Sequence, residues 1–234
     1  ITAGTFDTHD TNNYALTVAG STQIYDGGTL TCNASTVSLG STYSADYALN
    51  VRDGATFNGG TGAHTMGSIN VANETDSVLV LTTHASGTTL NDGMYGAAGL
   101  FNCGANSAIT STNSLVVLAT AQSNSIYNIF PRDKLNDVTI NSSGKTIRIE
   151  DVDATIKGDL TITAGTLTTL DADGSTSRNL TVHGLTTNAG TITANASTMT
   201  HNGLVTNTGT YATSSGTNNF NGGVRNLGTF TSDD

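Results

Sequence analysis

Apolar and polar residues alternate along most of the chain, in short runs bounded by Gly, Asn and Asp. In Thr191–Thr193 an isoleucine stands between two threonines, and the alternation continues in Leu204–Thr206. A period of two is that of a β-strand with one buried face, whereas an amphipathic helix repeats its apolar residues after three and four positions. Thr and Val suit strands, and Gly, Asn and Asp suit tight turns. The pattern therefore predicts short strands joined by tight corners.

The predicted strands recur at a fixed interval near the C-terminal end. The motif Asn-x-Gly-Thr returns every 19 residues, beginning at Asn188, Asn207 and Asn226. A second marker keeps the same interval, at Gly184, Gly203 and Gly222. A period near 20 residues indicates stacked supersecondary units. We therefore expect the three asparagines to stack at one corner, with their amides hydrogen-bonded from coil to coil. The apolar strand residues that should point inward are Ile192, Tyr211 and Phe230.

Looser copies of the same unit extend toward the N-terminus. Ile1–Phe6 matches Ile162–Leu167, and the spacing of the corners widens to 24 residues between Thr5 and Thr29 and 27 between Thr29 and Thr56. A solenoid tolerates coils of unequal length. The chain is therefore predicted to be all-β, a single-stranded parallel β-helix (β-solenoid) with coils of about 19–27 residues.

Charge divides the predicted solenoid into three parts. No Lys or Arg occurs between Arg52 and Arg132, whereas charged residues are dense after Arg132. We expect N-terminal coils over residues 1–76, an irregular, charge-poor middle over 77–135 and regular C-terminal coils over 136–234.

The middle segment holds more large apolar residues than a thin β-coil is expected to bury, because about every second strand residue faces inward. The stretch from about Ser77 to Pro131 is also poor in charge and contains Tyr, Phe and Met, which is the composition of an interface centre. We therefore expect an assembly interface there. A locally thicker core is the alternative.

Composition narrows the classes of function. The net charge is −10 and only 11% of residues are charged, so a nucleic-acid surface, which needs a basic stripe, is not expected. No apolar run approaches the length of a membrane span. The chain opens inside a repeat, which suggests a processed form or a piece of a longer protein. Cys32 and Cys103 are expected to be buried small side chains, or one disulfide in an oxidising compartment.

Several segments carry a resemblance to known repeats. Leu135–Asn141, Gly158–Leu167 and the Asn-x-Gly-Thr corners resemble the degenerate β-solenoid repeats of large bacterial surface proteins, and they are similar to repeats in phage tail and other virion structural proteins. The resemblance covers most of the chain outside the middle. It implies a parallel β-helix that serves as a shaft, spacer or adhesin, and it carries over no catalytic residue.

Two acidic corners have residues that could bind a metal ion. Asp171–Ser175 is similar to the first half of a calcium loop, because hard cations take several oxygen ligands from one loop. The distal glutamate of such a loop is missing, so Asp171 and Asp173 are also explained by a plain polar insertion. Asp7, His9 and Asp10 occupy the equivalent corner of the first coil.

Other candidate sites have weaker patterns. Ser143–Thr146 ends like a phosphate-binding loop but lacks the upstream glycine and the following helix. His183 and His201 lie about one coil apart, without a third zinc ligand. Asp151 and Asp153, with Asp171 and Asp173 a coil further on, would form the acidic patch of a glycan-cleaving enzyme. No Trp is available for a sugar groove, so we expect no enzymatic activity, no catalytic or metal residue and no cofactor.

The threonines that flank the inward residues predict an exposed ladder. Thr191 and Thr193, Thr210 and Ala212, and Thr229 and Thr231 would stack along one face. A flat Thr ladder is the surface of ice-binding solenoids, but Thr is also simply a good exposed strand residue.

The expected function is mechanical. We expect a structural element of a virion or cell-surface appendage, extracellular, and part of a homo-oligomer or a larger structural assembly. The alternative is an adhesin, a receptor- or glycan-binding module whose corner loops contact a cell surface. Neither nucleic acid nor membrane insertion is expected.

Overall fold

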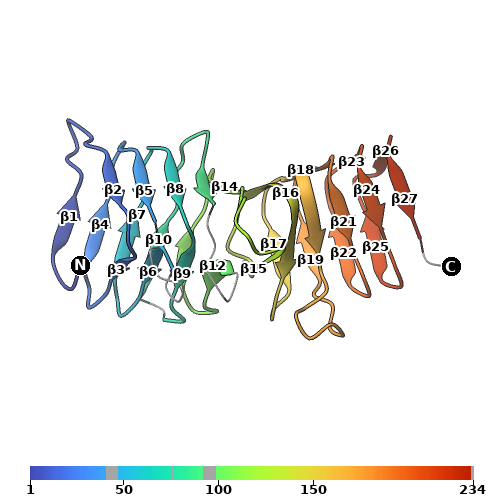
Figure 1. Cartoon of the computed structure of the whole chain (residues 1–234), viewed down its shortest axis with the longest axis horizontal. Coiled ribbons are helices and arrows are strands. Elements are labelled where there is room, and N and C mark those ends of the chain that lie inside the picture. The colour runs from blue at the N-terminus through green and yellow to red at the C-terminus, as the bar shows by residue number, and fades with distance from the viewer. Residues whose placement is uncertain (41–46, 75, 92–98, 233–234) are drawn as a thin grey trace. The chain divides into compact units, whose positions relative to one another are not determined.

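The computed structural model of the chain describes residues 1–40, 47–74, 76–91 and 99–232. These residues form strands, turns and bends without any helix, and the strands pair in parallel from coil to coil to build a β-solenoid of about ten turns. The predicted fold class is confirmed. The chain divides into two compact units, unit 1 over Ile1–Val117 and unit 2 over Leu118–Asp234, and their boundary lies inside the segment expected to be irregular (Figure 1).

Unit 1 contains three ladders of parallel strands, here called 1A, 1B and 1C, and the chain visits them in that order in each coil. Ladder 1A holds β1 (Thr5–Asp7), β4 (Thr29–Thr31), β7 (Thr56–Asn58), β10 (Val78–Val80) and β13 (Ala108–Thr110). Ladder 1B holds β2 (Leu16–Val18), β5 (Val37–Leu39), β8 (His64–Met66) and β11 (Thr88–Leu90). Ladder 1C holds β3 (Thr22–Ile24), β6 (Leu49–Val51), β9 (Ile69–Val71) and β12 (Gly99–Cys103). The next strand, β14 (Leu115–Leu118), spans the boundary between the units.

Unit 2 contains ladders 2A, 2B and 2C, again visited in that order. Ladder 2A holds β17 (Ala154–Ile156), β19 (Leu180–Val182), β22 (Thr198–His201) and β25 (Thr217–Phe220). Ladder 2B holds the first parts of β16 (Asp137–Ile149) and β18 (Leu160–Thr168), then β20 (Thr186–Asn188), β23 (Val205–Asn207) and β26 (Val224–Asn226). Ladder 2C holds β15 (Ile126–Phe130), the second parts of β16 and β18, then β21 (Thr191–Thr193), β24 (Thr210–Ala212) and β27 (Thr229–Thr231).

The corners use residues that tolerate a left-handed backbone. Asp26–Gly27 and Asp53–Gly54 stand at equivalent corners of successive coils in unit 1, and all four residues have φ between 52° and 73°. Gly adopts this region freely, and Asp and Asn adopt it more readily than other side chains. The Asp-Gly pair therefore turns the chain from ladder 1C into ladder 1A.

The predicted stack of asparagines is confirmed. Asn188 Nδ2 donates to Asn207 Oδ1 at 2.7 Å, and Asn207 Nδ2 donates to Asn226 Oδ1 at 2.7 Å. The amides lie at the last residue of β20, β23 and β26, and those of Asn188 and Asn207 are fully buried. The predicted corner therefore contributes its polar side chains to the interior of unit 2.

The predicted inward residues lie in one column. Ile192 and Tyr211 are fully buried, and the rings of Tyr211 and Phe230 stack at 5.2 Å between centroids with an interplanar angle of 7°. Phe230 remains 39% exposed because β27 is the last strand of its ladder.

The middle segment is more regular than expected. β10 pairs with β7 and with β13, so the stacking of ladder 1A continues through it. Some coils here exceed the predicted upper length: Asn70 and Asn102 are joined across one coil although they are 32 residues apart.

The premise of the interface prediction is wrong for the described residues, because most of the apolar side chains that motivated it are buried in the folded chain. These are Leu79, Leu81, Leu100, Phe101, Val116, Leu118, Tyr127 and Ile129. Met94 and Tyr95 lie outside the described residues. Burial of these side chains therefore explains most of this composition, and the assembly interface itself stays a prediction.

Candidate functional site

Of the four aspartates predicted to form an acidic patch, Asp151 and Asp171 lie together, beside Glu150, and arginines contact this group. Asp153 and Asp173 have other partners. Oxygen atoms of Glu150, Asp151 and Asp171 lie within 4.8 Å of one another. Arg178 donates from Nε and Nη2 to Asp171 Oδ2, the former at 2.6 Å, and the Asp151 N–H donates to the same oxygen. Burial would raise the pKa of Asp171, but these hydrogen bonds lower it below its usual value. Asp171 is therefore an ionised partner of Arg178 that ties two coils together.

Glu150 is the least satisfied member of this cluster. Its Oε2 atom is buried without a hydrogen bond, and the Arg148 Nε atom lies 3.9 Å away. Burial raises the pKa of Glu150, Arg148 opposes the rise, and Asp171 and Asp151 add to it. Two guanidinium groups already supply positive charge to three carboxyl groups, so the arrangement is an ion-pair network rather than an open cation site.

In the loop that is similar to a calcium loop, Asp171 and Asp173 bind different partners. Asp173 Oδ1 accepts the N–H groups of Ser175 and Thr176 at 2.8 Å, and its Oδ2 accepts the Thr176 hydroxyl at 2.6 Å. These bonds lower the pKa of Asp173 strongly. Its carboxylate holds its own turn, while that of Asp171 faces Arg178.

The acidic corner of the first coil has a similar local role. Asp7 Oδ1 accepts the His9 N–H and the Asn33 side-chain amide, both at 2.7 Å, the second from the next coil. Asp10 accepts the Thr11 hydroxyl at 3.1 Å. Asp7 and Asp10 therefore satisfy their own neighbours, as an exposed turn requires.

His183 and His201 do not face each other. His201 pairs in register with Val182, so His183 is one position further along its strand and its side chain lies on the opposite side of the sheet. His201 is fully buried between the Thr186 hydroxyl at 2.8 Å and the Tyr211 hydroxyl at 3.0 Å. His183 is exposed and bonded to the Asn202 amide. The zinc pair considered from their spacing is not assembled.

Acidic and amide side chains instead act as clamps between coils, a role that the sequence analysis missed. Asp137 Oδ1 accepts the Asp159 N–H and Asp159 Oδ1 accepts the Leu185 N–H, both at 2.8 Å. Asp153 accepts the backbone and side-chain N–H groups of Asn179 at 2.8 and 2.9 Å. We call these contacts coil clamps. The sequence does contain a signal for these contacts, since Asp or Asn precedes many strands. Because the coils differ in length, the sequence does not show which of these residues contact one another.

The two cysteines match the expectation of buried small side chains. Cys32 and Cys103 are both buried and are not joined by a disulfide. Burial, with a smaller contribution from Asp7, raises the pKa of the Cys32 thiol to about 12. This thiol is therefore protonated and unreactive.

The predicted Thr ladder forms and extends over four strands of ladder 2C. Thr166, Thr191, Thr210 and Thr229 are in register, as are Thr168, Thr193, Ala212 and Thr231. Beside the first row, glycines at the corner leave a shallow polar groove whose lining includes Lys145, Gly165, Gly190 and Gly209. The groove offers hydroxyl, backbone and one ammonium group to a ligand.

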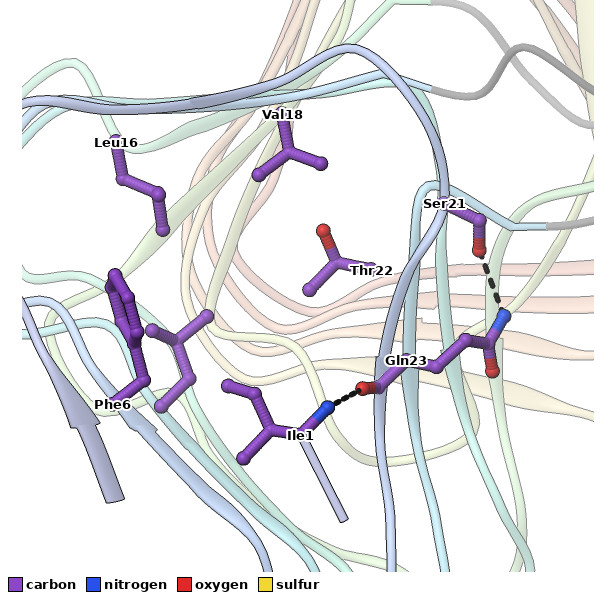
Figure 2. A pocket seen from close by; sticks show the side chains of 8 residues that line it. Ile1, Phe6, Leu16, Val18, Ser21, Thr22 and Gln23 are labelled. Carbon is purple, nitrogen blue, oxygen red and sulfur yellow. Dashed lines mark hydrogen bonds between the residues drawn. The ribbon is translucent and has the colours of Figure 1, made fainter. Parts of the chain in front are cut away.

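An apolar opening lies at the first coil of unit 1. Ile1, Phe6, Leu16, Val18 and Leu30 surround it. Figure 2 shows the side chains of Ile1, Phe6, Leu16 and Val18 around the opening. Two polar groups at its rim are paired: the Ile1 amino group donates to the Gln23 carbonyl at 2.7 Å, and the Gln23 amide donates to Ser21 Oγ at 2.8 Å (Figure 2). The Thr22 hydroxyl, which also lines the opening, is buried without a hydrogen bond. The lining is otherwise mainly apolar and includes no carboxyl, thiol or imidazole group.

No helix among the described residues is long and apolar enough to cross a membrane. No protein-family model, curated protein or solved structure matches this chain.

Proposed function

We propose that this protein is a structural element, a shaft, fibre or decoration of a virion or cell-surface appendage. The observation that supports the proposal is that many polar side chains form hydrogen bonds between coils. The aspartates and asparagines that could have formed a catalytic or metal site are coil clamps, as with Asp153 and Asn179, or form the internal amide ladder of Asn188, Asn207 and Asn226.

Such bonding suits a mechanical role. A parallel stack in which each coil is held by backbone pairs, clamps and buried amides unfolds only when many contacts break together. Proteases and surface forces act on the unfolded chain. A stack that rarely unfolds is therefore expected to survive outside the cell. An extracellular location follows from this proposal.

The location is tested with antibodies raised against the purified chain. They are expected to label intact, unpermeabilised cells or particles of the source organism. Label that appears only after permeabilisation would contradict the proposal. In a second measurement, thermolysin should cleave the folded chain at the rate of its global unfolding. Rapid cleavage inside the strands under native conditions would also contradict it.

A glycan- or receptor-binding role is the second candidate, favoured by the polar groove along ladder 2C. The stacked hydroxyls can donate to and accept from sugar hydroxyls, and the Lys145 ammonium group can donate to them. Saturable binding on a glycan array, lost in Thr191→Val and kept in Thr181→Val on ladder 2A, would support this role.

A further inference from the structure

The sequence contains Asn-Gly pairs that the fold places in different surroundings. They are Asn58–Gly59, Asn202–Gly203 and Asn221–Gly222. In such a pair the glycine nitrogen can attack the carbonyl carbon of the asparagine side chain, because glycine has no Cβ to hinder the approach and its backbone turns freely. The attack closes a five-membered ring and releases the amide nitrogen as ammonia. Whether it occurs in a folded protein depends on what holds the glycine N–H and the asparagine side chain.

The fold protects the first pair. Asn58 is the last residue of β7, and Gly59 is buried behind it. The Gly59 N–H donates to the Val80 carbonyl of the next coil at 2.9 Å. A nitrogen that is packed and hydrogen-bonded between coils cannot turn toward a side chain, so attack at Asn58 requires local unfolding first.

The second pair has the opposite surroundings. Asn202 is exposed, and it forms a bend with Gly203 between β22 and β23. Among the backbone hydrogen bonds of the described residues, none is donated by the Gly203 N–H. Residue 203 has to be glycine, because a Cβ there would overlap the Gly184 carbonyl of the preceding coil. The close contact between coils thus places a reactive pair at the surface of unit 2.

Two neighbouring side chains contact the atoms that would react. The Asn221 Nδ2 atom donates to Asn202 Oδ1 at 2.8 Å, and the His183 Nδ1 atom lies 2.9 Å from Asn202 Nδ2. The first contact stabilises the negative charge that develops on the carbonyl oxygen during attack. Once the carbon is tetrahedral, Nδ2 is a basic amine, and the Nδ1–H form of His183 can donate a proton to it.

We infer that Asn202 is a self-modification site, at which the folded chain converts asparagine into aspartate and isoaspartate. The Gly203 nitrogen bonds to Asn202 Cγ and gives its proton to solvent. The bond from Cγ to Nδ2 breaks, and ammonia leaves with a proton from His183, which regains one from solvent. Water then opens the succinimide at one of its two carbonyl groups, and the products are aspartate and isoaspartate. Either product replaces a neutral amide by a carboxylate on the flank of unit 2. This inference does not depend on the proposed structural function.

The test follows Asn58 and Asn202 in the same sample by peptide mapping and mass spectrometry, with enzymatic methylation to detect isoaspartate. The full chain is kept for several weeks at neutral pH, either folded or in concentrated urea. Asn202 should convert in the folded chain at least as fast as in urea. Asn58 should convert in urea but about tenfold or more slowly in the folded chain, because its attack requires local unfolding.

The variant His183→Asn separates chemistry from structure. Its amide can still accept a hydrogen bond from Asn202 Nδ2, but it cannot supply a proton. Conversion of Asn202 in the folded variant should slow by about tenfold, less than the roughly 100-fold that a general acid contributes in an enzyme, because His183 is exposed. The rate in urea should not change, and circular dichroism confirms that the variant is folded.

Three results would overturn the inference. The first is an Asn202 that keeps its amide in the folded chain during the time in which urea allows its conversion. The second is equal conversion of Asn58 and Asn202 in the folded chain. The third is a folded His183→Asn variant that converts Asn202 as fast as the unmodified chain.

Discussion

Unit 1 and unit 2 stack the same kind of strand but differ in what they bury between coils. The interior of unit 2 holds linked polar groups, the Asn188–Asn226 ladder and His201 between Thr186 and Tyr211. In unit 1 the comparable amide ladder, Asn50, Asn70 and Asn102, lies on β6, β9 and β12. Asn50 is 9% exposed, and Asn70 and Asn102 are half-buried.

Repeat length accounts for this difference. Equal 19-residue coils place Asn188, Asn207 and Asn226 directly above one another, so the buried amide groups of Asn188 and Asn207 each donate to the next asparagine. Asn188 is in register with Ile162 in the preceding coil, and its Oδ1 atom is buried without a hydrogen bond. Coils of 20 and 32 residues, as between Asn50, Asn70 and Asn102, change the surroundings of each position. A buried polar group there risks having no partner, which is the situation of His64. It is 2% exposed, and neither ring nitrogen makes a well-formed hydrogen bond.

The largest expected effect is acid destabilisation, which acts on both units. Burial lowers the pKa of His64 and of His201 from 6.5 to about 4. Between these pH values the unfolded chain binds protons that the folded chain does not, so the free energy of unfolding falls as the pH drops from about 6.5 to about 4 and falls no further through these groups below that. Each histidine should account for about 3 kcal/mol.

This loss is measured by urea unfolding at a series of pH values, with hydrogen exchange to assign it to each unit. The variants His64→Leu and His201→Leu should each remove the pH dependence of one unit only. A free energy of unfolding that is flat between pH 7 and pH 4 would contradict the buried, neutral state of these side chains.

Breaking the buried amide ladder should have the next largest effect. Asn207→Ala removes the acceptor of the buried Asn188 amide and the donor of Asn226. Leaving a buried donor unsatisfied costs about 2 kcal/mol. The matched change in unit 1, Asn70→Ala, exposes amides that water can reach and should cost less than about 1 kcal/mol. Equal losses in urea unfolding would show that the two ladders do not differ in the way their burial indicates.

The sequence predicts the regular part of this molecule much better than the irregular part. The 19-residue interval places Asn188, Asn207 and Asn226 in one line, and it predicts that Ile192 and Tyr211 point inward. The 19-residue interval does not predict that the amides are buried, because an Asn followed two positions later by Gly is typical of an exposed turn.

The coil clamps could not be predicted from the sequence, for a different reason. Asp153 meets Asn179 at a separation of 26 residues, while Asn179 meets Thr198 at 19. No single period connects both pairs, so only the folded coil shows them as one column. The burial of most apolar side chains in the middle segment was not predicted either, because the alternation of strand residues does not show how many side chains the folded coils bury.

The smallest expected effect is the change in the free energy of unfolding when each of the two buried histidines is replaced by leucine at neutral pH. His64→Leu removes a ring whose nitrogens are buried without good partners and keeps apolar contact with Phe57, whose ring lies 5.8 Å away. We expect it to raise the free energy of unfolding by about 1 kcal/mol, since burying an unsatisfied polar group is unfavourable. His201→Leu should lower it, because the Thr186 hydroxyl then loses its partner. Opposite signs at pH 7, measured on the same chain by urea unfolding, would confirm that the buried hydrogen bonds of His201 stabilise unit 2 and that the buried ring of His64 destabilises unit 1. Destabilisation of similar size by both substitutions would show instead that His64 has a favourable role in the core of unit 1.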